Sequence, residues 1–148
     1  MFKYPDEKEL TDTMFAYMQG YIDAVEHALY DDFASRRWAD YLDLATFVDY
    51  WFASELTSNA EGRHPQSIYL YKDRGSRLCA GPIWDNDYGT FMPGRSHHYY
   101  MREYLYYPAL FEDAAFVALV KERWPAAREH FLAAVSYTHL TLPTMAVV

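Results

Sequence analysis

The spacing of the apolar residues changes after residue 57, and this change limits what the chain can fold into. Before it, apolar residues recur every three or four positions in two stretches, as they do along one face of an amphipathic helix. This spacing predicts helices over residues 6–30 and about 43–57, with Asp6 and Asp43 as their N-caps. The apolar faces consist of Leu10, Met14, Tyr17, Met18, Tyr21, Ile22, Val25 and Leu29, and of Leu44, Phe47, Val48, Trp51, Phe52 and Leu56.

The next part of the chain has the composition of a β-hairpin. Residues 67–72 and 77–84 are rich in residues that favour strands, and a polar, glycine-containing turn separates them. Further on, the sequence predicts a short helix over 100–107 and a longer one over about 112–133, which Pro125 would kink or divide. The fold class that we predict is therefore α+β, with helices around a small antiparallel sheet.

Composition and charge exclude several classes of protein. Hydrophobic residues make up 51% and aromatic residues 19% of the 148 residues, which excludes a disordered chain. No apolar run reaches the roughly 20 residues of a membrane-spanning helix, and the opening residues do not resemble a signal peptide. The formal net charge of −8 argues against a nucleic-acid partner, and the single Cys79 excludes an internal disulfide. Neither the compartment nor the oligomeric state follows from these features.

The last residues differ in character from the rest. Residues 135–144 match what is read when a common transposase-type sequencing adapter is translated in frame; a native β-tail is the alternative. We therefore expect residues 1–134 to be the native part, and 135–148 to be a translated adapter tail. On this interpretation the chain is a piece of a longer protein.

Asp85 and Asp87 directly follow the second predicted strand and are the sharpest candidates for chemistry. If the backbone turns there, both carboxylates can bind one Mg²⁺ or Mn²⁺, because these cations prefer hard oxygen ligands. A solvated turn is the plainer interpretation of such a pair. We expect Trp84 to hold the pair at the mouth of the core, which favours the metal site.

Other polar residues lie where they can assist such a site. Asn59 and Glu61 follow the second predicted helix and offer an amide oxygen and a proton-accepting carboxylate. Lys72, at the hairpin turn, can neutralise a phosphate. A helix-end asparagine and solvated charges are the alternatives for these three residues. The tyrosine-rich segment 99–107 can stack on a sugar or a base, or simply pack against the core.

Three segments resemble the CotH family of kinase-like proteins when they are taken together, in order and at the right spacing. They read FVDYWFASELTSN (47–59), PQSIYLYKDRG (65–75) and LCAGPIWDNDYGTF (78–91). The opening residues 2–6 also resemble a segment of the bacterial members. The similarity spans about residues 2–110, and its specificity comes from the combination of segments.

The resemblance implies part of an atypical protein-kinase-like domain, its larger lobe. Active members transfer the ATP γ-phosphoryl group to Ser or Thr of a protein, such as a spore-coat component. By this analogy Asp85 is the metal-binding aspartate, supported by Asp87, and the cofactors are ATP with Mg²⁺ or Mn²⁺. Asn59 lies in the segment similar to the catalytic loop. Glu61 stands where active relatives often have an aspartate that acts toward the substrate hydroxyl.

Two departures from the family pattern affect the expected activity. Glu61 is one methylene longer than aspartate, which displaces its oxygens by about 1 Å and costs roughly 10²-fold if nothing compensates. The part in which a kinase carries its nucleotide-binding lysine is also not among these residues. We therefore expect no phosphotransfer from this chain alone.

Two further functions stay open on the sequence. The first is a CotH-like module that has lost catalysis and binds a protein or a glycan, which the aromatic content and Glu61 motivate. The second is a glycoside hydrolase that uses Asp85 or Asp87 together with Glu61, since such enzymes need paired carboxylates. No other pattern typical of a sugar-cleaving site accompanies these carboxylates.

Overall fold

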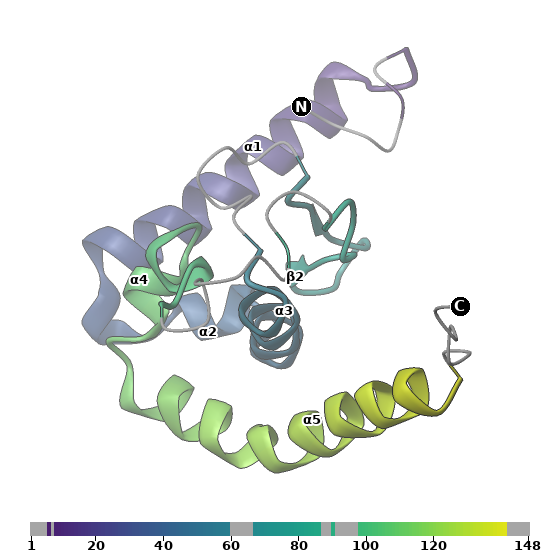
Figure 1. Ribbon diagram of the computed structural model, residues 1–148. Helices are drawn as coiled ribbons and strands as arrows, with labels where there is room; N and C mark the ends of the chain where they lie inside the picture. Colours follow the sequence, from purple (N-terminus) through teal and green to yellow (C-terminus); the bar gives the residue numbers. More distant parts are fainter. Residues whose placement is uncertain (1–5, 7, 60–66, 87–89, 91–97, 142–148) are drawn as a thin grey trace.

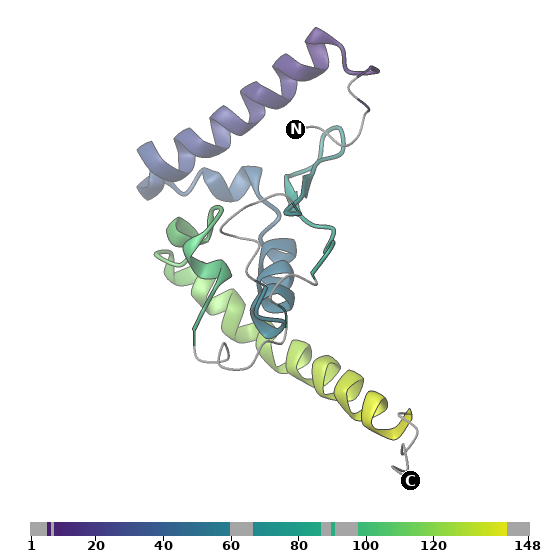
Figure 2. The ribbon, with the colours of Figure 1, turned by 45° about the horizontal axis from the view of Figure 1, so that its top comes forward.

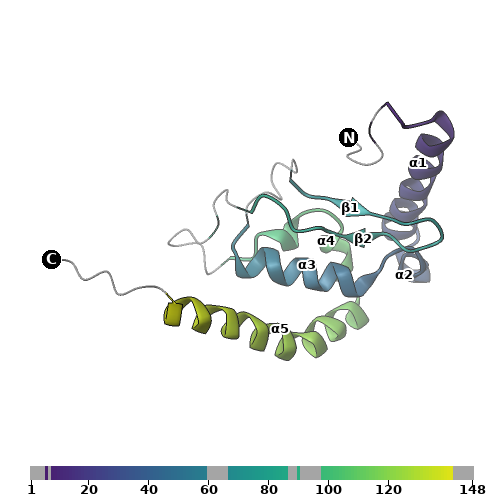
Figure 3. The same cartoon turned by 90° about the vertical axis from the view of Figure 1, so that its right-hand side faces the viewer.

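The helix α3 (Leu44–Leu56) lies at the centre of the fold. The hairpin of β1 and β2 lies along one side of α3 and the long helix α5 along another, while α1 and α2 lie toward its N-terminal end (Figure 3). The computed structural model describes residues 6, 8–59, 67–86, 90 and 98–141, and the side chains up to residue 136. Helices around one two-stranded antiparallel sheet confirm the α+β prediction.

The sequence of α3 explains its central position. Asp43 caps it as predicted, because its side chain accepts a hydrogen bond from the backbone N–H of Thr46 at 3.2 Å. Its buried residues form a broad side of the helix, and Asp49 lies on the exposed remainder; these buried residues are Phe47, Val48, Tyr50, Trp51, Phe52 and Ser54. Tyr107 from the C-terminal part donates its hydroxyl to the carbonyl of Phe47 at 2.8 Å, and burial raises the pKa of Tyr107 well above its usual range. The fully buried side chains of the core include Val25, Leu29, Trp38, Leu42, Phe47, Val48, Leu78, Met101, Tyr107, Leu110 and Phe116.

The predicted hairpin forms, but its strands are short. The strands β1 (Leu70–Tyr71) and β2 (Cys79–Ala80) pair in antiparallel register, with Leu70 opposite Ala80. The backbone N–H of Ala80 donates to the hydroxyl of Thr46 on α3 at 3.1 Å, and Leu78 also bridges to Leu42. These bonds attach the hairpin to the N-terminal half of α3.

The first helix is shorter than predicted at both ends. α1 (Asp12–Glu26) begins after Thr11, whose hydroxyl accepts the N–H of Met14 at 3.2 Å, whereas Asp6 caps a separate turn. It continues into a π-helical turn, η1 (His27–Asp31), followed by a 3₁₀ turn (Phe33–Ser35) and by α2 (Trp38–Tyr41). The N-terminal half of α1 projects away from the other elements (Figures 1 and 2).

The predicted helix over 100–107 is wrong. The structure has a 3₁₀ turn (Met101–Glu103), a break, and then α4 (Tyr107–Leu110). The break lies at Tyr104, which is extended, and at Leu105, which has a φ of +55°. Pro108 explains the second start, because proline has no N–H to donate and suits only the first turn of a helix.

The last helix, α5 (Ala114–Thr141), is longer than predicted. Asp113 caps it by accepting the N–H groups of Ala115 and Phe116 at 2.9 and 2.8 Å. Pro125 lies inside α5 without dividing it, and the helix curves gently along the body of the protein (Figure 1). The origin of residues 135–148 stays a prediction. Among the described residues no helix combines the length and the hydropathy that crossing a bilayer requires.

Candidate functional site

The candidate site begins where α3 ends. The N–H of Ser58 donates to the carbonyl of Glu55 at 3.0 Å, and the N–H of Asn59 donates to that of Ser54 at 2.8 Å. This pair of bonds is a Schellman motif, which stops a helix and reverses the chain. Ser58, and not Asn59, takes the left-handed conformation that the motif needs, with a φ of +56°. The reversal turns Asn59 inward, so that only 2% of it is exposed.

Asn59 joins the end of α3 to the segment that follows β2. Its Nδ2 donates a hydrogen bond to Oδ1 of Asn86 at 2.6 Å, across 27 positions of sequence. Asn86 stands between the two aspartates singled out in the sequence. The structure therefore brings Asn59 and the Asp85–Asn86 turn together. Glu61 and Asp87 lie outside the described residues.

The backbone turns at Asp85. This residue has a φ of +56°, in the left-handed region, and its side chain is exposed. The chain thus turns at Asp85, and a cation shared by Asp85 and Asp87 stays a prediction.

The expectation for Trp84 is wrong. We expected this side chain to anchor the aspartates to the core, but it is 60% exposed, and Ile83 before it is 43% exposed. The reason is that β2 ends at Ala80 and Gly81 has a φ of +125°, so the in–out alternation of a strand does not reach Trp84. The contacts of Asn86 hold the segment instead: its side chain bonds to Asn59, and its carbonyl accepts the hydroxyl of Thr90.

Lys72 contacts α1. Its ammonium group donates to the hydroxyl of Tyr17 at 2.8 Å and lies 4.5 Å from the centre of the Tyr21 ring, a cation–π geometry. This arrangement attaches the hairpin turn to the first helix. A role for Lys72 in phosphate binding stays a prediction.

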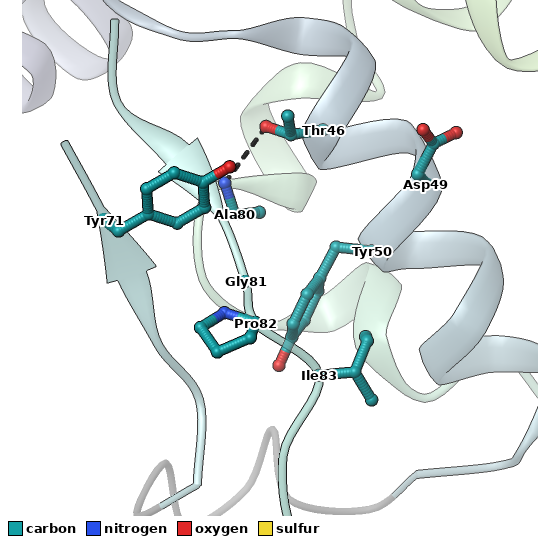
Figure 4. Close-up of a pocket in the computed structure, with 8 residues that line it drawn as sticks. All are labelled: Thr46, Asp49, Tyr50, Tyr71, Ala80, Gly81, Pro82 and Ile83. Atoms are coloured by element: carbon teal, nitrogen blue, oxygen red, sulfur yellow. Dashed lines mark hydrogen bonds between the residues drawn. The ribbon is translucent and has the colours of Figure 1, made fainter. Parts of the chain in front are cut away.

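A cavity of about 540 Å³ lies beside the segment that leads to Asp85 (Figure 4). One wall is α3 and the other is the hairpin, and the ring of Tyr50 extends from α3 toward Pro82 and Ile83. Carbon atoms dominate the wall, so the cavity suits an apolar group better than a charged one. Its lining residues are Thr46, Asp49, Tyr50, Tyr71, Ala80, Gly81, Pro82 and Ile83.

Sequence reasoning missed Glu55, one turn before Asn59. Its carboxylate accepts three backbone N–H groups, from Tyr100 at 2.7 Å, Met101 at 2.8 Å and Arg102 at 3.0 Å. Burial raises the pKa of the Glu55 carboxyl, and the three N–H donors offset part of that rise. Because the partners lie about 45 positions away, the local sequence carried no signal for this contact.

We expect replacement of Glu55 by glutamine to cost about 1 kcal/mol at neutral pH, because one of the two accepting oxygens becomes an NH₂ group. The two proteins should also differ in their pH dependence. Since the folded state holds the Glu55 proton more tightly than the unfolded state, the Glu55 contribution to stability falls as the pH rises from about 4.5 through the raised pKa. Urea unfolding of both proteins at several pH values measures this difference.

The glutamine variant serves as its own control, because every other titrating group is shared. If the difference in unfolding free energy between the two proteins were constant between pH 4 and 7, burial would not govern the Glu55 carboxyl. Over the described residues, Glu55 thus anchors segment 100–102 to the same end of α3 that carries Asn59.

The side chains at this site carry oxygen atoms of the kind that bind a hard cation such as Mg²⁺. Asp85 offers carboxylate oxygens at a turn, and Asn59 and Asn86 are amide side chains held beside it. Within the described part of the chain no three His, Cys, Asp or Glu side chains cluster closely enough to hold a metal ion. A metal site here would need further ligands, for which Asp87 is the sequence candidate.

Comparison with known proteins identifies the family to which the chain belongs. The model of the CotH kinase protein family matches residues 1–138. Searches of curated proteins and of solved structures gave no match. The match covers most of the 148 residues and includes all three segments in which the resemblance was found. The chain belongs to the CotH kinase family.

Proposed function

We propose that this chain carries part of a phosphotransfer site, which moves the γ-phosphoryl group of ATP to Ser or Thr of a protein. The observation that supports this most is the bond between Asn59 and Asn86, which puts the end of α3 beside the turn at Asp85. Phosphoryl transfer needs cations on the phosphates and a positioned acceptor more than it needs covalent catalysis. A polar helix end beside an exposed aspartate suits that requirement.

Each residue of the proposed site has a proposed role. Asp85 and Asp87 would hold Mg²⁺ or Mn²⁺, which neutralises charge on the phosphates when it is bound. Asn59 keeps the Asp85 turn in place through Asn86. Glu61 would accept the proton of the substrate hydroxyl, and Lys72 would contact a phosphate. The carbon-lined cavity next to the turn offers room for an apolar side chain of the protein acceptor.

Asp85 is the residue whose change tests the proposal. Replacing it by asparagine keeps the size and removes the charge, so the affinity for Mg²⁺–ATP should fall by at least about tenfold, or 1.4 kcal/mol. The measurement is calorimetric titration of ATP, with and without Mg²⁺, into a protein that contains residues 1–134 in their natural sequence context.

Asp73 supplies the matched control, because it is an exposed aspartate in the hairpin turn of the same protein. The Asp73→Asn variant should bind as the unchanged protein does. Binding of ATP that needs no divalent cation, or that survives the Asp85 change as well as the Asp73 change, would refute the proposed role of Asp85.

A further inference from the structure

A second hollow, apart from the carbon-lined cavity, lies on the segment that precedes α4. It has a volume of about 790 Å³, within the range of small-ligand sites. Its wall combines aromatic rings with a guanidinium and a carboxylate, a mixture that the cavity of Figure 4 lacks. We call it the tyrosine basin; its lining residues are His98, Tyr99, Tyr100, Arg102, Glu103, Tyr104 and Pro108.

Contacts with α3 and with the core hold the backbone of the tyrosine basin in place. The carboxylate of Glu55 binds three consecutive N–H groups of this segment, and Met101 in its middle is fully buried. The guanidinium of Arg102 lies 4.9 Å from the centre of the Phe111 ring, which restricts its position. A surface fixed in this way loses little conformational entropy when a ligand binds.

Tyr99 is the most prominent ring of the tyrosine basin. It is 60% exposed, yet its ring centre lies 5.8 Å from that of Trp51, which is only 8% exposed. A large aromatic side chain of this kind has one part backed by the core and another part open to solvent. Such a ring provides a platform for stacking, because burying its open face against a ligand removes apolar surface from water.

We propose that the tyrosine basin binds a saccharide. The C–H face of a pyranose ring packs on an aromatic ring, while its hydroxyl groups need donors and acceptors at the edge. Tyr99 supplies the ring, Arg102 a planar set of donors, and Glu103 an exposed acceptor beside them. This binding does not depend on the proposed phosphotransfer, because neither Asp85 nor Asn59 lines the basin.

A nucleic-acid strand or a purely apolar side chain fits the tyrosine basin less well than a sugar does. A nucleic-acid strand would bring a row of phosphates to a chain with a formal net charge of −8. A purely apolar side chain would bury the charged groups of Arg102 and Glu103 without partners, which is costly. A neutral sugar has both an apolar face and hydroxyls, so it matches each part of the wall.

Calorimetric titration of the whole chain with cellotetraose, maltotetraose and tetra-N-acetylchitotetraose tests the saccharide site. We expect at least one of the three to bind with a Kd of about 1 mM or tighter. The Tyr99→Ala variant should lose at least about tenfold in affinity for that sugar, and Glu103→Ala about fivefold. Since Glu103 is exposed, its variant tests the site even if Tyr99→Ala unfolds.

Tyr30 provides the matched control, because it is 57% exposed and lies in the π-helical turn after α1. Tyr30→Ala should bind the sugar as the unchanged chain does. The saccharide site is refuted if none of the three sugars binds with a Kd of about 1 mM or tighter. It is also refuted if the Glu103 and Tyr30 variants bind alike, or if oligo-dT binds the basin in place of the sugars.

Discussion

Replacement of Asp113 by alanine should destabilise the fold by about 2 to 4 kcal/mol. Asp113 is only 9% exposed, and one of its oxygens caps α5 through the N–H groups of Ala115 and Phe116. Its other oxygen lies 2.8 Å from Nε of Arg36, which ties the turn before α2 to the start of α5. The change removes a helix cap and a largely buried carboxylate that also binds the guanidinium of Arg36. Urea unfolding followed by circular dichroism measures the loss.

The second Arg–Asp pair of α5 is the control. Arg123 binds Asp49 of α3 with two nitrogens, at distances between 2.6 and 3.0 Å, but the Asp49 carboxylate is 56% exposed, whereas that of Asp113 is 10% exposed. Solvent screens such a pair, so Asp49→Ala should cost less than about 1 kcal/mol. Equal losses in the Asp113 and Asp49 variants would contradict the assignment of Asp113 as the main tie between α5 and the rest of the fold.

Replacement of Asn59 by alanine should cost about 2 to 3 kcal/mol, because it removes a buried side chain and takes the donor away from Asn86. The bond itself is measured by a double-mutant cycle with Asn86→Ala. We expect the two changes to be non-additive by about 1 kcal/mol, since the second finds the bond already lost. Unfolding free energies of the four proteins give this coupling.

A second double-mutant cycle, between Asn59→Ala and Tyr30→Ala, is the control for this coupling. Tyr30 is an exposed residue in the π-helical turn after α1, and its change should add to that of Asn59 within about 0.5 kcal/mol. If Asn59 and Asn86 were as additive as Asn59 and Tyr30, the end of α3 and the turn at Asp85 would not be joined in solution.

Patterns of neighbouring residues in the sequence predicted those helices and strands that depend on contacts within a few positions. The helix α3 and its Asp43 cap follow from spacing and from a contact three positions away, and the hairpin follows from strand-forming runs around a turn. The start of α1 was misplaced because Asp6 and Thr11 are both good caps, and only Thr11 caps the helix. The break at Leu105 was missed because its apolar neighbours continue the helical spacing.

Contacts between distant parts of the chain could not be predicted in this way. Glu55 meets its partners about 45 positions further on, and Arg36 meets Asp113 across 77. For the candidate site, the sequence singled out Asn59 and Asp85 but not their connection through Asn86. It also took Trp84 for a core residue, because it could not show that the strand ends at Ala80.

Titration of Mn²⁺ into the isotope-labelled chain, followed by NMR, tests the shared site most directly, because this ion broadens the signals of nearby nuclei. If the end of α3 and the turn at Asp85 form one cation site, the side-chain amides of Asn59 and Asn86 and the backbone amide of Asp85 should broaden first. The Asp85→Asn variant should lose this effect. Broadening that begins instead at the exposed pair Asp31 and Asp32, while Asn59 and Asn86 stay sharp, would contradict a cation site at this place.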